Sequence, residues 1–194
     1  SWPLLLANLL QSLYGFVDML VVGRHVGSAG LVAVGNAAML GFVVTSVSIG
    51  LGVGGAVRIA GHAGAGARDR LKPTADTMLT LSLLLSAAVT AGVLLALDPL
   101  LALLGVPSEA VADARAYTAV VTAGTVFVFG FNAAGSLLRG LGDSRRPLRF
   151  ILLAAVVNVA LDLLLVGPLG MGVAGAAYAT VAAQAAACAA STLC

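Results

Sequence analysis

The chain has 194 residues, of which 60% are hydrophobic and only 9% are charged, and its formal net charge is +2. Soluble globular domains carry about 25% charged residues, so this composition excludes an ordinary soluble enzyme or binding domain. Repeated long apolar runs instead place the chain in the class of all-α integral membrane proteins.

Six apolar segments follow one another, each near the roughly 20 residues that a helix needs to cross a bilayer. We place these helices at about 2–23, 31–60, 73–97, 109–138, 147–166 and 172–194. Glycine or proline marks the connections, which are short, so successive helices are expected to be antiparallel neighbours. Residues 1–194 are therefore predicted to form one bundle of six transmembrane helices.

The second segment contains the glycine-rich stretch Gly50–Gly55. A phosphate-binding loop would need a preceding strand and a Gly-Lys-Ser/Thr sequence, and the chain has neither here. We interpret these glycines as sites of close helix packing and a flexible turn.

Eight of the ten Lys and Arg residues fall in two connections. They are Arg58, Arg68, Arg70 and Lys72 between the second and third segments, and Arg139, Arg145, Arg146 and Arg149 between the fourth and fifth. An up-and-down count puts both connections on one side, which the positive-inside rule assigns to the cytoplasm together with the N-terminus. We therefore expect a multi-pass protein of the cell inner (plasma) membrane, and topology explains the basic residues better than nucleic-acid binding does.

Two carboxylates stand inside otherwise apolar segments, Asp18 in the first and Asp162 in the fifth. An ionised Asp at the bilayer centre costs about 2.5–3.5 kcal/mol on insertion scales, so such residues usually mark a functional site. The alternative is that each Asp is a structural hydrogen-bonding group within the bundle.

Polar residues recur at helical spacing on four segments. They are Asn8, Gln11 and Asp18 on the first, Thr118, Thr122, Thr125 and Asn132 on the fourth with Tyr117 beside them, Asn158 and Asp162 on the fifth, and Thr180 and Gln184 on the sixth. Spacings of three and four residues put each group on one helical face, and we expect the four faces to meet at a shared cavity. For the threonines, hydrogen bonding to their own backbone is an equally weighted alternative.

Carboxylate, amide and hydroxyl oxygens are suited to a proton or to a hard cation such as Na⁺. Burial disfavours the charged form of a carboxyl group, and a second carboxylate nearby disfavours it further. The pair Asp18 and Asp162 is therefore expected to hold a proton, or Na⁺, and to release it when water or a cationic substrate arrives. No metal-ligand spacing and no Ser/His/Asp or Cys/His arrangement is present, so we expect neither a cofactor nor an enzyme.

Short motifs in order along the whole chain resemble those of the multidrug and toxic compound extrusion (MATE) family. They are Pro3, Tyr14-Gly-Phe-Val-Asp18 with Val22-Gly-Arg24, Gly61-His-Ala-Gly-Ala-Gly66, Leu138-Arg-Gly-Leu-Gly-Asp143 with Arg146-Pro147, Asn158-Val-Ala-Leu-Asp162, and Gly170-Met-Gly-Val-Ala-Gly-Ala-Ala177 leading to Thr180. The resemblance is to the N-terminal lobe, and it points to the DNA-damage-inducible (DinF-like) branch.

The resemblance implies one six-helix lobe of a twelve-helix, two-lobe transporter that exports organic cations and other amphipathic compounds in exchange for H⁺ or Na⁺. The implied coupling site consists of Asp18, Asn158, Asp162 and Thr180, with Tyr117 and Asn132 nearby and a backbone carbonyl from Ala176. Pro3 would belong to a bend of the first helix that accompanies protonation. Loading of Asp18 and Asp162 from outside would change the contacts of the first helix and release drug outward.

The chain begins with Ser1 rather than Met and stops at Cys194 without a polar flank, so we expect a fragment whose partner, the C-terminal lobe, is absent. Two alternatives stay open. A lipid-linked oligosaccharide flippase of the same superfamily would show more cationic residues in its cavity to hold pyrophosphate. An intramembrane aspartyl-type enzyme would need two carboxylates that share a proton and bind one water.

Overall fold

The computed structural model describes the backbone of residues 2–192, and their side chains except at residues 2–8, 11, 14 and 29. This part of the chain is helical and contains no strand. In chain order the elements are α1 (Trp2–His25), α2 (Ser28–Gly64), the 3₁₀ turn η1 (Arg68–Arg70), α3 (Leu71–Leu95), α4 (Leu97–Leu103), α5 (Val111–Ala123), α6 (Thr125–Gly140), α7 (Arg145–Leu165) and α8 (Gly172–Thr192).

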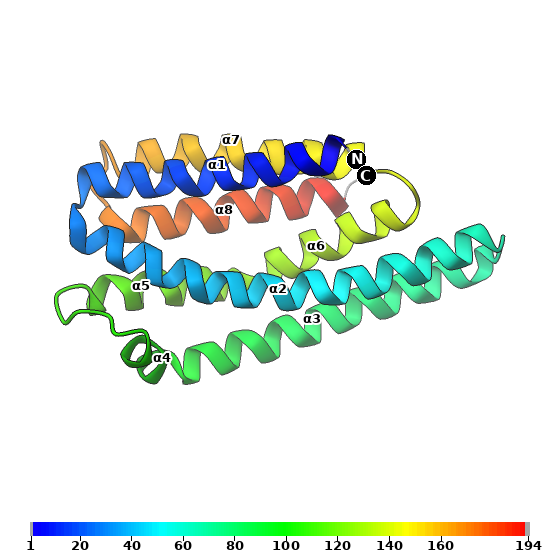
Figure 1. Ribbon diagram of the computed structural model, residues 1–194, viewed down its shortest axis with the longest axis horizontal. Helices are drawn as coiled ribbons and strands as arrows, with labels where there is room; N and C mark the ends of the chain where they lie inside the picture. Colours follow the sequence, from blue (N-terminus) through cyan, green and yellow to red (C-terminus); the bar gives the residue numbers. More distant parts are fainter. Residues whose placement is uncertain (1, 193–194) are drawn as a thin grey trace.

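The helices form two layers (Figure 1). One layer contains α1, α7 and α8, and the other contains α2, α3 and the consecutive pair α5–α6. Helix α8 joins the layers, because it packs against α7 on one side and against α5 and α6 on the other. Its sequence explains this central place, since small residues such as Gly175, Ala179 and Ala183 let neighbouring backbones approach closely.

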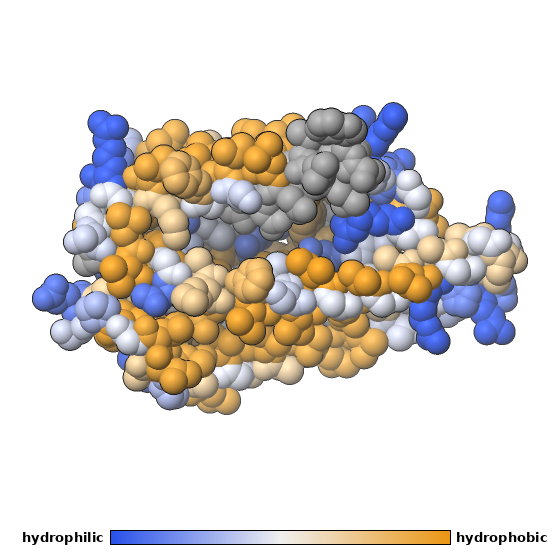
Figure 2. Space-filling view, in the orientation of Figure 1, coloured by the Kyte–Doolittle hydropathy of each residue, from blue (hydrophilic) through white to orange (hydrophobic). Residues whose placement is uncertain are grey.

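Four helices of the described part, α2, α3, α7 and α8, are long and apolar enough to cross a membrane, and the pair α5–α6 is a fifth candidate, bent by 44°. Helix α1 has 24 residues, and at 1.5 Å per residue it is about 36 Å long, enough to cross a hydrocarbon core of roughly 30 Å. On the face shown in Figure 2, hydrophilic residues gather at the two ends and apolar residues cover the middle. Large apolar side chains are exposed on the bundle, among them Phe42 and Val57.

Three helix boundaries differ from the sequence-based ones. The segment expected at 109–138 is divided at Gly124 into α5 and α6. Helix α4 lies mostly in the connection that the segments 73–97 and 109–138 leave between them, and Pro99 is in its first turn, where a helix does not need its N–H. Helix α2 has 37 residues, and together with α3 it extends beyond the other helices at one end of the bundle (Figure 1).

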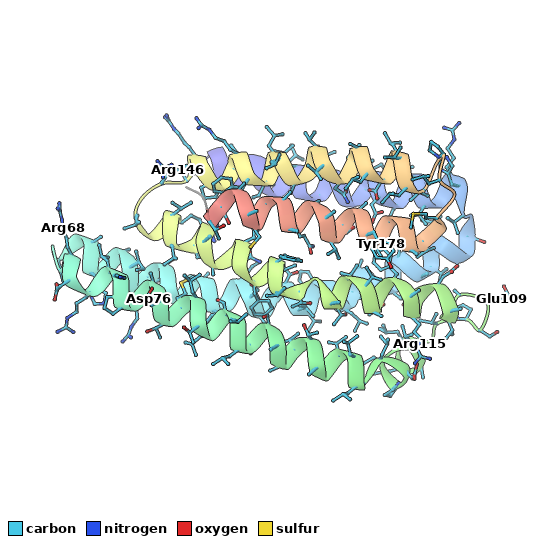
Figure 3. The ribbon with its side chains drawn as sticks, turned by 180° about the vertical axis from the view of Figure 1, so that it is seen from behind. Arg68, Asp76, Glu109, Arg115, Arg146 and Tyr178 are labelled. Carbon is cyan, nitrogen blue, oxygen red and sulfur yellow. The ribbon has the colours of Figure 1, made fainter. Side chains whose placement is uncertain are left out.

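The two basic connections lie at the same end of the bundle, as the up-and-down count predicted. Figure 3 places Arg68 of η1 and Arg146 at one end, and Glu109 and Arg115 at the other. We call the end with the α2–α3 and α6–α7 connections the basic end, and the opposite one the far end. The α6–α7 connection is held by Asp143, whose Oδ1 accepts hydrogen bonds from the backbone N–H groups of Arg145 (2.9 Å) and Arg146 (3.1 Å).

The stretch Gly50–Gly55 is helical, and the packing expected from the sequence holds for Gly52 and Gly55, whereas Gly50 and Gly54 face open space. Gly52 faces Ser136 of α6, and Gly55 faces Met78 of α3. The approach is equally close from the other side, since a Cβ atom on Gly140 would lie 2.8 Å from the carbonyl oxygen of Ala56. Small residues on both helices thus bring α2 and α6 into contact and fix one wall of the space between the layers.

A buried carboxylate cluster beside a cavity

A cavity of about 470 Å³ lies between the two layers. Residues of α1, α2, α3, α5, α6 and α8 line it, and α7 contributes none of the described lining. Much of the wall is apolar, with Phe16, Met19 and Val34 among its residues. Its polar part is Ser12, Asp18, Thr45, Tyr117, Thr118, Thr122, Thr125, Thr180 and Gln184. Asp18 is the only charged side chain of this described lining, so the cavity combines an apolar wall with one acidic position.

Asp18 lies near the far end of α1, in a segment anchored by the buried side chains of Val21 and Val22. It is 6% exposed. Its Oδ2 accepts a hydrogen bond from the hydroxyl of Tyr117 on α5 at 3.3 Å. Its Oδ1 is buried without a hydrogen-bond partner in the described part of the chain. One carboxylate oxygen therefore remains available to a ligand that enters from the cavity.

Asp162 and Asn158 lie one turn apart on α7, and they are 0% and 1% exposed. Asn158 donates from Nδ2 to Thr180 Oγ1 at 3.5 Å. Asn158 Oδ1 and both oxygens of Asp162 have no hydrogen-bond partner among the side chains that the structure describes. Both residues are sealed behind the cavity wall because the small side chains of α8 let α7 pack closely against it.

Asp18 and Asp162 lie close enough to interact electrostatically, and Tyr117 is within the same range of both carboxylates. Neither acid forms an ion pair with a described Lys, Arg or His. Two ion pairs, Arg115–Asp98 and Arg146–Asp143, lie outside the bundle interior. Buried charges without partners are costly, and proteins normally neutralise them. Two protons or monovalent cations would make this cluster electrically neutral, and one would leave a single negative charge to be shared by the two carboxylates.

The structure brings Asp18, Asn158, Asp162 and Thr180 together, with Tyr117 beside them. Thr180 connects the two halves of the cluster, because it lines the cavity and also accepts from Asn158. The expectation that all the polar faces open onto one cavity is only partly right. Asp162 and Asn158 lie behind the wall, and their contribution to ion binding stays a prediction.

The other expected residues are placed differently. Asn132 lies in a separate cavity of about 70 Å³ between α6, α7 and α8. The bend after Gly124 redirects α6, so Asn132 does not continue the face formed by Thr118 and Thr122. Ala176 is fully buried in the core beside α7. Pro3 and Gln11 belong to α1, but their side chains lie outside the described residues.

Two polar positions of the site were missed by the sequence analysis. Thr45 of α2 lines the cavity, but α2 carries no polar face with helical spacing that would have indicated it. Thr90 of α3 donates to the carbonyl oxygen of Thr122 at 3.2 Å, next to the break between α5 and α6. The role of Thr90 can be recognised only once the break is known, because its hydroxyl satisfies a backbone carbonyl that the end of α5 leaves without a helical partner.

In the described part of the chain, no group of three or more His, Cys, Asp and Glu residues could hold a metal ion. The available donors are carboxylate, amide and hydroxyl oxygens. Such hard ligands do not suit soft or imidazole-preferring transition metals. They fit a proton or an alkali-metal cation, which in this setting would be a transported substrate rather than a resident cofactor.

A bundle of apolar helices around a buried acidic cluster and an adjoining cavity is the architecture of a membrane transporter lobe. The MatE family model matches residues 3–164, so the chain belongs to the MatE family. It is 36% identical over 184 residues to the probable multidrug resistance protein YoeA of Bacillus subtilis, covering 92% of this chain and 40% of that protein. It is 34% identical over 188 residues to the probable multidrug resistance protein YpnP of the same organism, covering 95% and 41%.

The fold shows the same relationship. A crystal structure of MATE in the bent conformation superposes with a TM-score of 0.93 at 32% sequence identity, covering 98% of this chain and 42% of that one. The chain spans about two fifths of the length of the relatives that it matches. It therefore corresponds to one lobe of a two-lobe, all-α membrane transporter. These matches confirm that the chain belongs with transporters, and the intramembrane enzyme alternative is set aside.

Proposed function

We propose that this chain is the coupling lobe of an antiporter that exports organic cations and other amphipathic xenobiotics in exchange for H⁺ or Na⁺. One observation carries the proposal: Asp18 on the wall of a mostly apolar cavity and Asp162 behind that wall are buried, and neither has a cationic partner among the described residues. An apolar wall with one acidic position is complementary to an amphipathic cation. The sealed cluster behind it is complementary to a small inorganic cation or a proton.

The two ligands would compete for the same negative charge. A drug in the cavity lies beside Asp18, which is on the cavity wall. A proton or Na⁺ bound between Asp18 and Asp162 neutralises that charge, with Asn158 Oδ1 and Thr180 Oγ1 as uncharged ligands. Tyr117 holds Asp18 in place through its hydroxyl. Loading of the small cation then weakens drug binding, which is the differential affinity that coupled exchange requires.

The same reasoning extends to the surroundings. Alternating access needs a second lobe that rocks against this one, so the partner is the other lobe of the same protein. The apolar middle of the bundle lies in a lipid bilayer, which we take to be the cell inner (plasma) membrane. The positive-inside rule puts the basic end, and with it the N-terminus, in the cytoplasm. The DinF-like assignment and the role of Pro3 in bending α1 belong to this proposal too.

A flippase for lipid-linked oligosaccharides is less well supported. Recognition of pyrophosphate calls for Arg or Lys side chains with several donors. The described lining of the cavity has neither, and its one charged residue, Asp18, would repel the ligand. The charge of the wall therefore favours cationic over anionic cargo.

The test uses the full-length transporter that contains this lobe, reconstituted in vesicles. Efflux of a fluorescent organic cation is followed under an imposed proton gradient and then under a Na⁺ gradient. Wild type is compared with Asp18→Asn, Asp162→Asn and the control Asp76→Asn, an exposed carboxylate on α3 (Figure 3). We expect efflux driven by one of the two gradients, lost in both site variants and kept in the control. Unchanged coupled efflux in Asp162→Asn would overturn the proposal.

A further inference from the structure

Two cavities of this lobe share a wall. The cavity beside Asp18 and the smaller one of about 70 Å³ that contains Asn132 have three lining residues in common: Thr45, Val128 and Gln184. The smaller cavity has polar atoms in its wall and is large enough to hold water. The two spaces are thus adjacent, and only the side chains of the shared wall separate them.

The smaller cavity lies on the side of the carboxylate cluster that faces the basic end. On α8 its wall residue Ala187 lies seven residues beyond Thr180, which is about 10 Å along the helix axis. On α7 its wall residues Ala154 and Ile151 lie one and two turns before Asn158. Helix α8 ends and α7 begins at the basic end (Figure 1). The lining residues on both helices therefore place the second cavity nearer to the basic end than the carboxylate cluster is.

Gln184 lies at the boundary between the two spaces. It follows Thr180 by four residues on α8, so the two side chains are on the same face. Its Oε1 is fully buried and has no hydrogen-bond partner among the described residues. An unpaired amide oxygen in a low-dielectric interior is unfavourable. Polar surroundings lie on both sides of Gln184, with Thr180 on one side and the second cavity on the other. A water molecule or a cation passing between the cavities would find its ligand there.

A polar series continues from the second cavity to the basic end along α6. Asn132, Ser136 and Arg139 are spaced by four and three residues, which places them on one face. Ser136 is 1% exposed, and Arg139 donates from its guanidinium to Ser136 Oγ at 2.6 Å. Arg139 lies in the last turn of α6. The series thus ends in the positive charge of Arg139, which repels a cation and opposes its passage along this face.

We propose that the coupling cation leaves the site through the lobe itself, from Asp18 and Asp162 past Gln184 into the second cavity and on towards the basic end, where Arg139 acts as the gate. This route rests on the function proposed above. It separates the path of the small cation from that of the drug, which is far too large for a 70 Å³ space. Gln184 lines the first cavity and is a positioning residue for the passing cation, outside the cation-binding group Asp18, Asn158, Asp162 and Thr180.

The first experiment changes Gln184 in the full-length transporter. Gln184→Leu removes the amide oxygen, Gln184→Glu keeps an oxygen at that point, and Ser46→Ala is the control, since Ser46 is exposed on α2 and bonds only to the carbonyl of Phe42. Two quantities are measured: the turnover rate of gradient-driven efflux, and the equilibrium binding of the coupling ion, by ²²Na⁺ binding or by proton release on drug binding. We expect Gln184→Leu to lower the turnover rate several-fold with unchanged ion affinity. We expect Gln184→Glu to turn over at about the wild-type rate.

The second experiment tests the gate. Arg139→Gln should produce a leak of the coupling ion down its gradient in the absence of drug, and the fluorescence of a pH or Na⁺ indicator inside the vesicles reports it. Wild-type turnover in Gln184→Leu, or loss of its ion binding, would overturn the route. So would the absence of any leak in a folded Arg139→Gln protein. Failure of the proposed function would look different, because Asp162→Asn would then keep coupled efflux.

Discussion

Two carboxylates, one just before α7 and one near its other end, are in opposite situations. At the basic end, Asp143 is partly exposed, and its oxygens accept from two backbone N–H groups and contact the guanidinium of Arg146 at 3.3 Å. Towards the far end, Asp162 is fully buried, and neither of its oxygens has a partner among the described residues. The same side chain is thus satisfied where burial is slight and unsatisfied where burial is complete.

The difference lies in the donors that each carboxylate can reach. Asp143 precedes α7 by two residues and accepts from N–H groups of its first turn, where the N-terminus of the helix favours negative charge. Asp162 lies in the interior, where an unpaired charge is most costly, and the small residues of α8 keep water from it. Stability alone would have favoured an apolar residue at position 162, which is why the proposed function assigns this carboxylate to ion binding.

The largest expected effect is that substitution of Asp162 abolishes coupled efflux without lowering the stability of the protein. Asp162→Asn keeps the shape of the side chain and removes its charge, so we expect coupled efflux to fall to background while the unfolding temperature in detergent stays the same or rises. Thermal unfolding and efflux are measured on the same preparation. A marked drop in unfolding temperature would indicate that Asp162 is mainly structural, and the comparison would fail.

The next effect concerns the seal between α7 and α8. Ala176 is fully buried and lies one turn from Thr180 on the same face of α8. Ala176→Leu overfills this contact and should reduce the free energy of unfolding by about 1–3 kcal/mol. Denaturant unfolding of the lobe in detergent measures it. Ala182→Leu, at an exposed position of the same helix, is the matched control and should leave stability unchanged.

A smaller effect is expected where Asp18 does have a donor. Tyr117→Phe removes the hydroxyl that donates to Asp18 Oδ2, and a typical buried hydrogen bond contributes about 1 kcal/mol to stability. The free energy of unfolding should fall by that amount in chemical denaturation. Tyr178→Phe is the control, because Tyr178 is 50% exposed on α8. Equal results for the two variants would mean that the bond between Tyr117 and Asp18 contributes nothing.

The smallest effect is expected at Asp143. The backbone N–H of Arg146, then that of Arg145 and the nearby guanidinium charges, hold the pKa of Asp143 below its ordinary value of 3.8. A lowered pKa means that the ionised carboxylate stabilises the fold above pH 3.8 and that this contribution is lost as the pH falls through the native pKa. Asp143→Ala should therefore unfold at a slightly lower temperature at neutral pH, and the difference from wild type should shrink in acid. A difference that grows in acid would contradict this assignment.

Much of the fold could be predicted from the sequence because the bilayer imposes strong constraints on it. Apolar length identifies spanning helices, and the positions of Arg68 and Arg146 in alternate connections place them at one end. The break at Gly124 could not be predicted in this way, since a glycine inside a membrane helix usually serves packing. Its effect depends on α8, where Val181 approaches Gly124 so closely that a Cβ atom would lie 2.7 Å from a methyl group.

The residue types of the site could be predicted from the sequence, but not which of these residues face the cavity and which lie buried behind its wall. Spacing alone put Asn158 and Asp162 on one face and brought Asp18 and Thr180 towards them. Spacing does not say whether a face meets a cavity or a neighbouring helix, and that choice was made by the packing of α7 on α8. Asn132 lines the second cavity and not the first for a related reason, because helical periodicity carries no information across a bend.

The length of α2 gives this lobe a mechanical property. The helix lines the cavity with residues from Val34 to Thr45 and continues without interruption to Gly64. Its portion beyond Thr45 measures about 28 Å at 1.5 Å per residue, so a tilt of about 10° at the cavity moves the outer tip by about 5 Å. Helix α2 is therefore one continuous rod from the cavity to the basic end, along which a small rotation at the cavity becomes a larger displacement at the outer tip.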